Sequence, residues 1–384
     1  MKRFLPALLL ALANLALAPF MGLLRDWLFE TFPGSSVKIV AGVLALIAGG
    51  VLLAAVLRIR DGRSWRFVGL GLVVALVLLQ SLVFNRGNLR VDVVEKVHFV
   101  QYGLLALLVY RGLRGRPEEA PVDASLYLLP VLWAALAGIL EEWVQWLVPV
   151  RTGEVMDVVL NAYAALCGTL VAVALFPPPE PVRLLHRPSL ARARAVLRTA
   201  ALATLLLAGF YHSAHLGYWV EYASEDPVCR FRSWFTEEGL LAAKAERAVH
   251  WASAPPRLEA LAVEDRYVSE AGWHIHARNT AWQQQDWLTA WHESQILERY
   301  YAPFLDVPPL PGTGNYRLHP DQMRQIEEGF RSVRSEAASG TYTSRVLENR
   351  ITLWPRGKAA FWAEALSLAA VLLLVSLWKG KGRE

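Results

Sequence analysis

Long apolar runs dominate the chain, and short polar connections separate them. Eight of these runs approach the roughly 20 residues that an α-helix needs to cross the hydrocarbon core of a bilayer. They cover residues 4–24, 37–57, 65–84, 97–110 with its flanks, 125–148, 156–176, 196–217 and 359–378. This pattern predicts an all-α fold, a polytopic transmembrane helical bundle of about eight spans.

The basic residues of the connections predict the orientation of this bundle. Lysine and arginine precede the first span and gather again after the second, fourth, sixth and eighth spans. Because cytoplasmic loops are enriched in these residues, we expect both termini to be cytoplasmic. The long segment 218–357, between the seventh and eighth spans, is then extracytoplasmic.

The spans and their connections divide the chain into six segments. The longest polar segment is of a size that folds as one domain. The segments are two N-terminal transmembrane helices (1–60), a four-helix membrane core (65–176), a cytoplasmic linker rich in proline and arginine (177–195), a seventh span (196–217), the extracytoplasmic domain (218–357) and the last span with a basic cytoplasmic tail (358–384).

Composition and charge argue against several classes of protein. The chain is 54% hydrophobic and 19% charged, whereas a soluble domain has roughly 25% charged residues. The net charge of +5 resides in short loops beside the spans, so it reflects membrane topology and we expect no nucleic-acid partner. Cys167 and Cys229 form no CxxC pair, and His212 with His215 lacks a third ligand. We therefore expect no metal and no cofactor.

The segment 218–357 is predicted to be mainly helical. Thr236 can cap the start of one helix and Ser269 the start of another, and the stretch 283–301 has helical periodicity. Eight of the fifteen tryptophans fall in this segment. Two interpretations remain open: the aromatic rings form a domain core, or they form a surface that stacks on sugars, lipid headgroups or a partner.

Ionisable and amide residues interrupt three neighbouring spans at one predicted membrane depth. A charged group inside a bilayer costs roughly 2.5–3.5 kcal/mol, so such residues mark a protein interior or a watery cavity. They belong to the outer ends of the fourth, fifth and sixth spans and to the loop that joins the fifth span to the sixth. The candidate ligand-binding residues are Glu95, Lys96, His98, Tyr102, Glu142, Gln145, Arg151, Asp157 and Asn161.

Helical spacing favours a shared site for these residues. Pairs within the set, such as Asp157 with Asn161, are three or four positions apart and therefore share a helix face. On the sixth span, Ala164 and Gly168 form a small-xxx-small pair. Such a pair allows a neighbouring helix to approach closely, so these two are the predicted helix-packing residues.

The same residues resemble the VanZ-like family of bacterial membrane proteins. The resemblance covers roughly residues 65–176 and rests on the order and spacing of five pieces. These are Glu95-Lys96-Val97-His98-Phe99 with Tyr102, Glu142-x-x-Gln145, Pro149-Val150-Arg151, Asp157-x-x-x-Asn161 and Gly168. The chain departs from the family pattern at Ala164 and Val150, where glycines are usual, and at Glu95, where aspartate is usual.

The resemblance implies a protein of the bacterial cell envelope, in the cytoplasmic (inner) membrane. The family is named for a protein associated with antibiotic resistance, to the glycopeptide teicoplanin, and it implies no particular reaction. Together with the polar cluster, it leads us to expect an outward-facing pocket for an anionic group. Arg151 offers a planar fork to a phosphate or carboxylate, and Lys96 a point charge. The expected partners are membrane lipids, a cell-wall precursor lipid, an exopolysaccharide or other glycan, or a glycopeptide.

Two alternatives remain open from the sequence. His98 with Glu142 or Asp157 is a possible acid/base pair of a membrane-embedded hydrolase. The sequence contains no recognisable nucleophile motif, so whether the protein is an enzyme is not decided. In the other alternative, the polar residues form a buried network that fixes how the spans pack, and the protein is a structural scaffold of an envelope assembly.

Overall fold

The computed structural model describes residues 2–83, 89–115, 123–148, 153–178, 182, 189–223, 228–254, 256, 265–309, 316–337 and 341–377. Within these ranges, eight helices are long and apolar enough to cross a membrane. They confirm the prediction of a helical membrane bundle and indicate a multi-pass membrane protein. Their bounds are Lys2–Thr31, Ser36–Arg58, Ser64–Val83, Asp92–Arg114, Ser125–Leu147, Val155–Leu175, Leu190–Ala214 and Gly357–Leu377.

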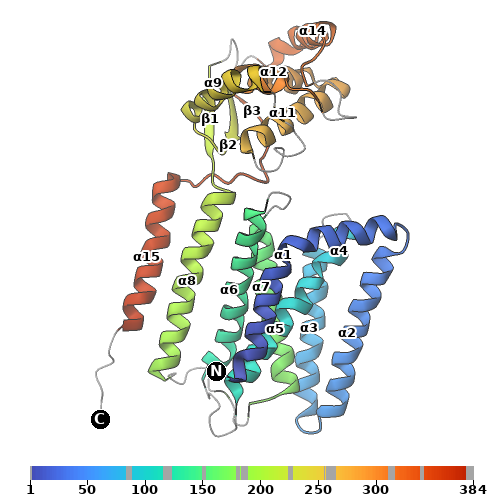
Figure 1. Cartoon of the computed structure of the whole chain (residues 1–384), viewed down its shortest axis with the longest axis vertical. Helices are drawn as coiled ribbons and strands as arrows, with labels where there is room; N and C mark the ends of the chain where they lie inside the picture. Colours follow the sequence, from blue (N-terminus) through green and yellow to red (C-terminus); the bar gives the residue numbers. More distant parts are fainter. Residues whose placement is uncertain are drawn as a thin grey trace. The chain divides into compact units, whose positions relative to one another are not determined.

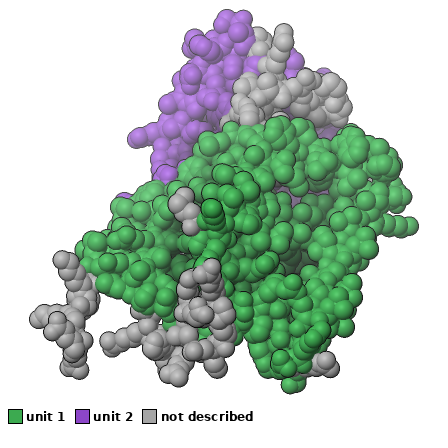
Figure 2. Space-filling view, turned by 60° about the horizontal axis from the view of Figure 1, so that its bottom comes forward, with its two compact units in different colours: residues 1–211, 362–384 green, residues 212–361 purple. Residues whose placement is uncertain are grey.

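The chain forms two compact units, which Figure 2 shows in different colours. Unit 1 comprises residues 1–211 and 362–384, and unit 2 comprises residues 212–361. The membrane helices, labelled in Figure 1, follow a short 3-10 turn at Lys2–Phe4. They are α1 (Leu5–Thr31), α2 (Ser36–Arg58), α3 (Arg63–Val83), α4 (Leu89–Glu95), α5 (Val97–Arg114), α6 (Ser125–Leu147), α7 (Val155–Leu175), α8 (Leu190–Ala214) and α15 (Gly357–Leu377).

Three spans differ by more than two residues from their predicted bounds. The seventh, predicted over 196–217, is a helix over Leu190–Ala214. Helix α1 continues to Thr31, past the predicted end at residue 24. The predicted span stops before Arg25 and Asp26, but the helix continues through these two exposed residues, whose side chains pair with each other at 2.8 Å. The fourth span starts within α4 and continues through α5, with Lys96 between the two helices.

Helix α7 lies at the centre of unit 1. Of the most apolar 18-residue stretch of α7, 61% is buried, whereas for the corresponding stretch of α2 the share is 6%. Helices α3, α5 and α6 pack against α7, and α1 packs against α5 and α6. In Figure 1, α2 and α3 lie on one side of α5, α6 and α7, and α8 and α15 lie on the other. The three helices with the candidate residues therefore form the interior of the bundle.

Helices α5 and α7 approach each other backbone to backbone. A Cβ atom added at Gly168 would lie 2.1 Å from the carbonyl oxygen of Gly103, a distance that real side chains do not reach. Ala164, one turn earlier on α7, is fully buried. The structure thus places the small residues Ala164 and Gly168 against α5, where a larger side chain would separate the helices.

Arginine side chains bind the polypeptide at the opposite end of α7. Arg66 of α3 is buried and donates to the carbonyl oxygens of Ala174, at 2.6 Å, and Leu175, at 3.2 Å. Arg114 of α5 donates to the carbonyl oxygen of Pro177 at 2.8 Å. Arg66 satisfies carbonyls that the last turn of α7 leaves without an internal partner, Arg114 binds a carbonyl just beyond the helix, and both charges suit a helix C-terminus.

Unit 2 combines a small sheet with five helices among its described residues. Strand β1 (Tyr218–Tyr222) pairs antiparallel with β2 (Cys229–Ser233), and β2 pairs in parallel with β3 (Tyr342–Thr343), in the order β1-β2-β3. The helices are α9 (Glu237–Ser253), α11 (Arg266–Gln283), α12 (Trp287–Tyr300), α13 (Ala302–Leu305) and α14 (Pro320–Ala337).

A backbone bridge joins the two ends of unit 2. Gly217 N–H donates to the carbonyl oxygen of Thr352 at 3.1 Å, and Thr352 N–H donates to that of His215 at 2.8 Å. Leu216 and Thr352 therefore form an isolated parallel β-bridge. The chain enters and leaves unit 2 at neighbouring points.

The helix boundaries in unit 2 agree with the sequence in one case and correct it in two. Thr236 Oγ1 accepts from Gly239 N–H, as predicted for a cap. The predicted cap at Ser269 is wrong, because Asp265 caps α11 and its carboxylate accepts two backbone N–H groups. The stretch 283–301 forms a helix as predicted, but only from Trp287 to Tyr300. It starts late because Gln285 has a φ of 59°, which is incompatible with an α-helix.

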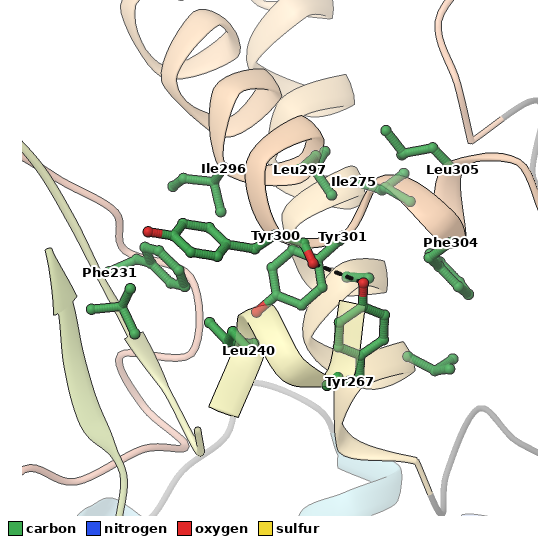
Figure 3. Packing of buried hydrophobic residues seen from close by; sticks show 14 of the residues in the cluster. Phe231, Leu240, Tyr267, Ile275, Ile296, Leu297, Tyr300, Tyr301, Phe304 and Leu305 are labelled. Carbon is green, nitrogen blue, oxygen red and sulfur yellow. Dashed lines mark hydrogen bonds between the residues drawn. The ribbon is translucent and has the colours of Figure 1, made fainter. Parts of the chain in front are cut away.

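Aromatic and aliphatic side chains together form the core of unit 2, as Figure 3 shows. Tyr267, Tyr300 and Tyr301 are fully buried, and the Tyr267 hydroxyl donates to the carbonyl oxygen of Tyr300 at 2.7 Å. Trp219 and Trp273, in contrast, are each 40% exposed. The core interpretation therefore holds for these tyrosines, while these two tryptophans are on the surface.

Buried carboxylates join the helices of unit 2 to its sheet. The hydroxyls of Ser233 and Tyr301 and the N–H of Trp234 all donate to Glu270 on α11, at 2.5–2.7 Å. Burial raises the pKa of Glu270, and these three hydrogen bonds oppose that rise. The carboxylate therefore connects α11 to the end of β2 and to the residue after α12.

A second buried network surrounds Glu293 on α12. His274 Nδ1 lies 2.5 Å from one carboxylate oxygen, and the hydroxyls of Ser344 and Tyr342 donate to the other at 2.6 and 2.8 Å. The neighbouring His292 is also buried, and its ring stacks on Tyr342 at 4.3 Å. Among the described residues, neither nitrogen of His292 has a hydrogen-bond partner. Burial lowers the pKa of His292 to about 4, and the nearby Glu293 carboxylate partly opposes this.

We expect Gly168→Ala to destabilise unit 1, because its new methyl group has to push α5 away from α7. The expected cost is about 1–3 kcal/mol, the usual range for overpacking a core. Gly103→Ala is the matched control, since its Cβ would meet ordinary contacts at 3.5 Å or more. Thermal melting of both variants in detergent measures the difference. Equal melting temperatures for the two variants would contradict the close approach.

We expect unit 2 to lose stability as the pH falls from about 6.5 to about 4. Unfolded His292 takes up a proton near pH 6.5, whereas folded His292 stays neutral until about pH 4, so protons favour the unfolded state in that interval. The expected loss is on the order of 3 kcal/mol. Hydrogen exchange of α12 amides in the full chain measures it. In His292→Phe, which keeps a stacked ring, this pH dependence should be weaker; an unchanged profile would contradict the assignment.

Candidate functional site

His98 and Asn161 join α5 to α7 at one end of the membrane core. His98 Nδ1 lies 2.6 Å from Asn161 Oδ1, and Asn161 is fully buried. Since an amide oxygen can only accept, the hydrogen-bond pattern assigns the proton to Nδ1 of His98. The His98 ring also stacks on Tyr102, one turn further along α5, with 6.2 Å between ring centroids. The histidine is therefore fixed by an amide and an aromatic ring.

Buried carboxylates on α6 face this end of α5. The Tyr102 hydroxyl donates a short hydrogen bond to Glu141 Oε2. Gln145 Nε2 is within hydrogen-bond distance of both Glu141 Oε1, at 3.3 Å, and Glu142 Oε1, at 3.2 Å. All four side chains are at most 3% exposed. The amide of Gln145 and the phenol of Tyr102 thus supply the donors that two adjacent buried carboxylates require.

Glu142 also positions the start of α7. Its second carboxylate oxygen, Oε2, accepts the backbone N–H of Glu154 at 3.0 Å. Glu154 is the residue immediately before α7, where backbone N–H groups lack helical partners and the helix dipole favours negative charge. Gly153 lies close by, since a Cβ atom there would be 2.7 Å from the Glu142 carbonyl oxygen. The end of α6 therefore holds the end of the loop that precedes α7.

Glu95 and Lys96 lie at the junction between α4 and α5. Lys96 Nζ donates to Gln80 Oε1 of α3 at 2.5 Å, and Gln80 is itself buried. Glu95 is 8% exposed. The structure thus places Lys96 next to an amide of α3, and the described contacts of its ammonium group do not include His98 or Glu142.

Asp157 and Arg151 complete the candidate set. Asp157 lies in the first turn of α7 and is half-buried. Arg151 and the family-like residues Pro149 and Val150 lie outside the described residues. The structure therefore brings His98, Tyr102, Glu142, Gln145 and Asn161 together directly or through Glu141, and it leaves the position of Arg151 undescribed.

One buried donor of this cluster is unpaired. Among the described residues, Asn161 Nδ2 has no hydrogen-bond partner. Gly138 of α6 makes room for it, because a Cβ atom at that position would lie 2.8 Å from the amide nitrogen. A buried amide donor without a partner costs about 1–3 kcal/mol, so it is a natural position for an acceptor atom of a ligand or for a water molecule.

The site contains two residues that the sequence did not select. Glu141 belongs to the polar segment of α6, but the family pattern selects Glu142, three positions before Gln145, and leaves Glu141 out. Gln80 lies inside an apolar run of α3, where one amide gives a weak signal. Both become recognisable only when the helices are packed, because their partners Tyr102 and Lys96 lie on other helices.

Metal-binding side chains do not cluster in the described part of the chain. No group of three or more His, Cys, Asp or Glu side chains there is arranged to hold an ion. The carboxylates of α6 bind an amide and a phenol, and His98 binds an amide.

Comparisons with protein-family models, with curated proteins and with solved structures found no match for this chain.

We expect Tyr102→Phe to destabilise unit 1 by about 1–3 kcal/mol, because Glu141 loses a donor inside the membrane core. The ring and its packing remain, so the change reports on the hydroxyl alone. Tyr127→Phe on α6 is a matched control, because no hydrogen bond of its hydroxyl is described. Thermal melting in detergent distinguishes the two variants. If Tyr102→Phe melts like the wild type, the hydroxyl does not support the carboxylate.

Proposed function

We propose that the chain is a VanZ-like integral membrane protein of the bacterial cell envelope that binds the anionic head group of an envelope lipid. The observation that supports this most directly is the unpaired, buried Asn161 amide beside His98, at the end of the three most central helices. An anionic oxygen placed there would accept from Asn161 Nδ2. Lys96 at the neighbouring helix junction and Arg151 in the adjoining loop would supply positive charge.

In this proposal, the buried carboxylates of Glu141 and Glu142 support the site by holding its residues in place. Glu142 holds the backbone just before α7. Glu141, bonded to Tyr102, holds α5 against α6 and thereby fixes the position of His98. The two carboxylates next to the anion site accept hydrogen bonds from Tyr102, Gln145 and the backbone before α7, and these donors offset part of their negative charge.

The proposed orientation is the one that the basic connections indicate. Both termini are cytoplasmic, residues 218–357 are extracytoplasmic, and the ends of α5, α6 and α7 with the polar cluster face the outer leaflet. A site there meets the head group of a lipid carrier for cell-wall or polysaccharide synthesis, or a glycopeptide at the outer surface. An anionic lipid is preferred because the free donor and the cations suit a phosphate.

A hydrolase is less well supported. The Nδ1 atom of His98 is bonded to the amide of Asn161, and the sequence contains no recognisable nucleophile motif. A packing role is the stronger alternative, because Tyr102–Glu141 and His98–Asn161 each join two helices of the core. In that case the polar network orders the bundle, and the protein acts as a scaffold of an envelope assembly.

We expect undecaprenyl phosphate to raise the melting temperature of the wild-type protein in detergent, because a ligand that binds only the folded state stabilises it. Arg151→Ala should reduce the shift without changing the melting temperature of the free protein. Arg60→Ala, which removes an arginine from the connection between α2 and α3, is the matched control and should keep the full shift.

The same measurement separates the alternatives. A shift that survives Arg151→Ala and Asn161→Ala would show that the lipid binds elsewhere. If undecaprenyl phosphate produces no shift, and Asn161→Ala and Glu142→Gln only lower the melting temperature, the network is structural and the scaffold alternative holds. Loss of turnover on a phosphoester substrate in Glu142→Gln, with the lipid shift intact, would support the hydrolase.

A further inference from the structure

A polar groove lies in unit 2, far along the chain from the cluster in the membrane core. It has a volume of about 650 Å³, within the range of roughly 300–1,000 Å³ that is typical of small-molecule sites. Helices α12 and α14 form its two walls, and the end of β1 closes one side. The walls include Trp291, Gln295 and Arg299 from α12, and Glu327, Arg331 and Arg334 from α14. We call this the α12–α14 groove.

The sequence brings the two walls together through aromatic packing. Trp291 stacks on Phe330 with their ring centroids 5.1 Å apart and an angle of 13° between the planes. Gly329 allows α14 to lie close to α12, because a Cβ atom there would be 2.3 Å from the Trp287 ring. Ile326 is fully buried at the same contact. The groove therefore has an aromatic base that belongs to the folded core of unit 2.

The walls of the groove have a net positive charge. Three arginines line it, Arg299, Arg331 and Arg334, against two glutamates. Neighbouring side chains orient two of these guanidinium groups. Arg299 lies 4.7 Å above the Tyr222 ring, and Arg331 pairs with Glu327 at 2.5 Å. A guanidinium held in one orientation offers paired donors to an oxyanion with little further loss of side-chain entropy.

We propose that the α12–α14 groove binds an anionic saccharide, a sugar with a carboxylate or phosphate group. Trp291 is partly exposed and stacks on the buried Phe330, and it offers aromatic surface to the apolar C–H face of a sugar ring. The arginines bind the anionic group, and the amide of Gln295 and the glutamates bind hydroxyls. A neutral sugar would leave the arginine charge unused, and a bare inorganic anion would make no use of the aromatic base.

This inference is independent of the proposed head-group site. The groove belongs wholly to unit 2, whereas the head-group site belongs to α5, α6 and α7 of unit 1. Failure of lipid binding would leave the saccharide proposal intact, and the reverse is equally true.

Isothermal titration calorimetry of the full chain in detergent tests the proposal. The probes are an oligogalacturonate for a carboxylated sugar, glucose 6-phosphate for a phosphorylated sugar, maltotetraose for a neutral sugar, and inorganic phosphate. We expect one of the two anionic sugars to bind more tightly than both maltotetraose and phosphate. Its affinity should fall as salt is added, because the arginines contribute charge.

Variants locate the binding to the groove. The double variant Arg331→Gln/Arg334→Gln should weaken binding of the anionic sugar by about tenfold or more, as expected when charge-assisted hydrogen bonds are lost. Arg324→Gln is the matched control, because Arg324 is an exposed arginine of the same helix that pairs with Asp321 and is not a lining residue of the groove. It should bind like the wild type. All these residues are on the surface of α14, so the fold should be retained, and circular dichroism checks this.

Each contrary result overturns the proposal. Equal binding of maltotetraose and the anionic sugars would show that the arginines do not select charge. Inorganic phosphate that binds as tightly as the sugars would indicate a plain anion site. No binding of either anionic sugar, or equal loss in the double variant and in Arg324→Gln, would also rule out the assigned site.

Discussion

The close approach of α5 and α7 at Gly103 and Gly168 is the constraint on which the membrane unit depends. Lipid tails are as apolar as leucine side chains, so apolar burial gives little reason for one helix to choose another inside a bilayer. Backbone contact between small residues provides that choice, and it sets the rotation and depth of both helices. With α5 and α7 fixed in this way, His98 meets Asn161 and the Tyr102 hydroxyl reaches α6.

Buried polar groups then restrict the remaining freedom in both units. In unit 1, Glu141 and Glu142 have donors from α5, from α6 and from the backbone before α7, so each carboxylate holds two segments in register. In unit 2, Glu270 and Glu293 do the same between helices and sheet. Misplacing either end would leave a buried charge uncompensated, which costs far more than the bond itself contributes. The polar residues thus specify which of several apolar packings is adopted.

The fold could be predicted from the sequence wherever one physical signal is strong and local. Apolar run length identifies the spans, and Thr236 identifies a helix start, because both depend only on nearby residues.

The sheet of unit 2 was missed because β3 has two residues and pairs with β2 from more than a hundred positions away along the chain. The cap at Ser269 was wrong because Asp265, a stronger acceptor, lies just upstream. In the candidate site, spacing within one helix groups Asp157 with Asn161, but the partner of Tyr102 depends on how helices rotate against each other, which spacing does not determine.

The backbone bridge between Leu216 and Thr352 has a consequence for how this architecture can vary. Because the chain enters and leaves unit 2 at neighbouring points, the residues in between form an insertion between α8 and α15 whose ends are held together by the bridge. Lengthening, shortening or exchanging that insertion need not move α8 or α15, as long as the bridge is retained. A chain with a different insert between α8 and α15 would therefore be geometrically equivalent as long as the bridge is retained.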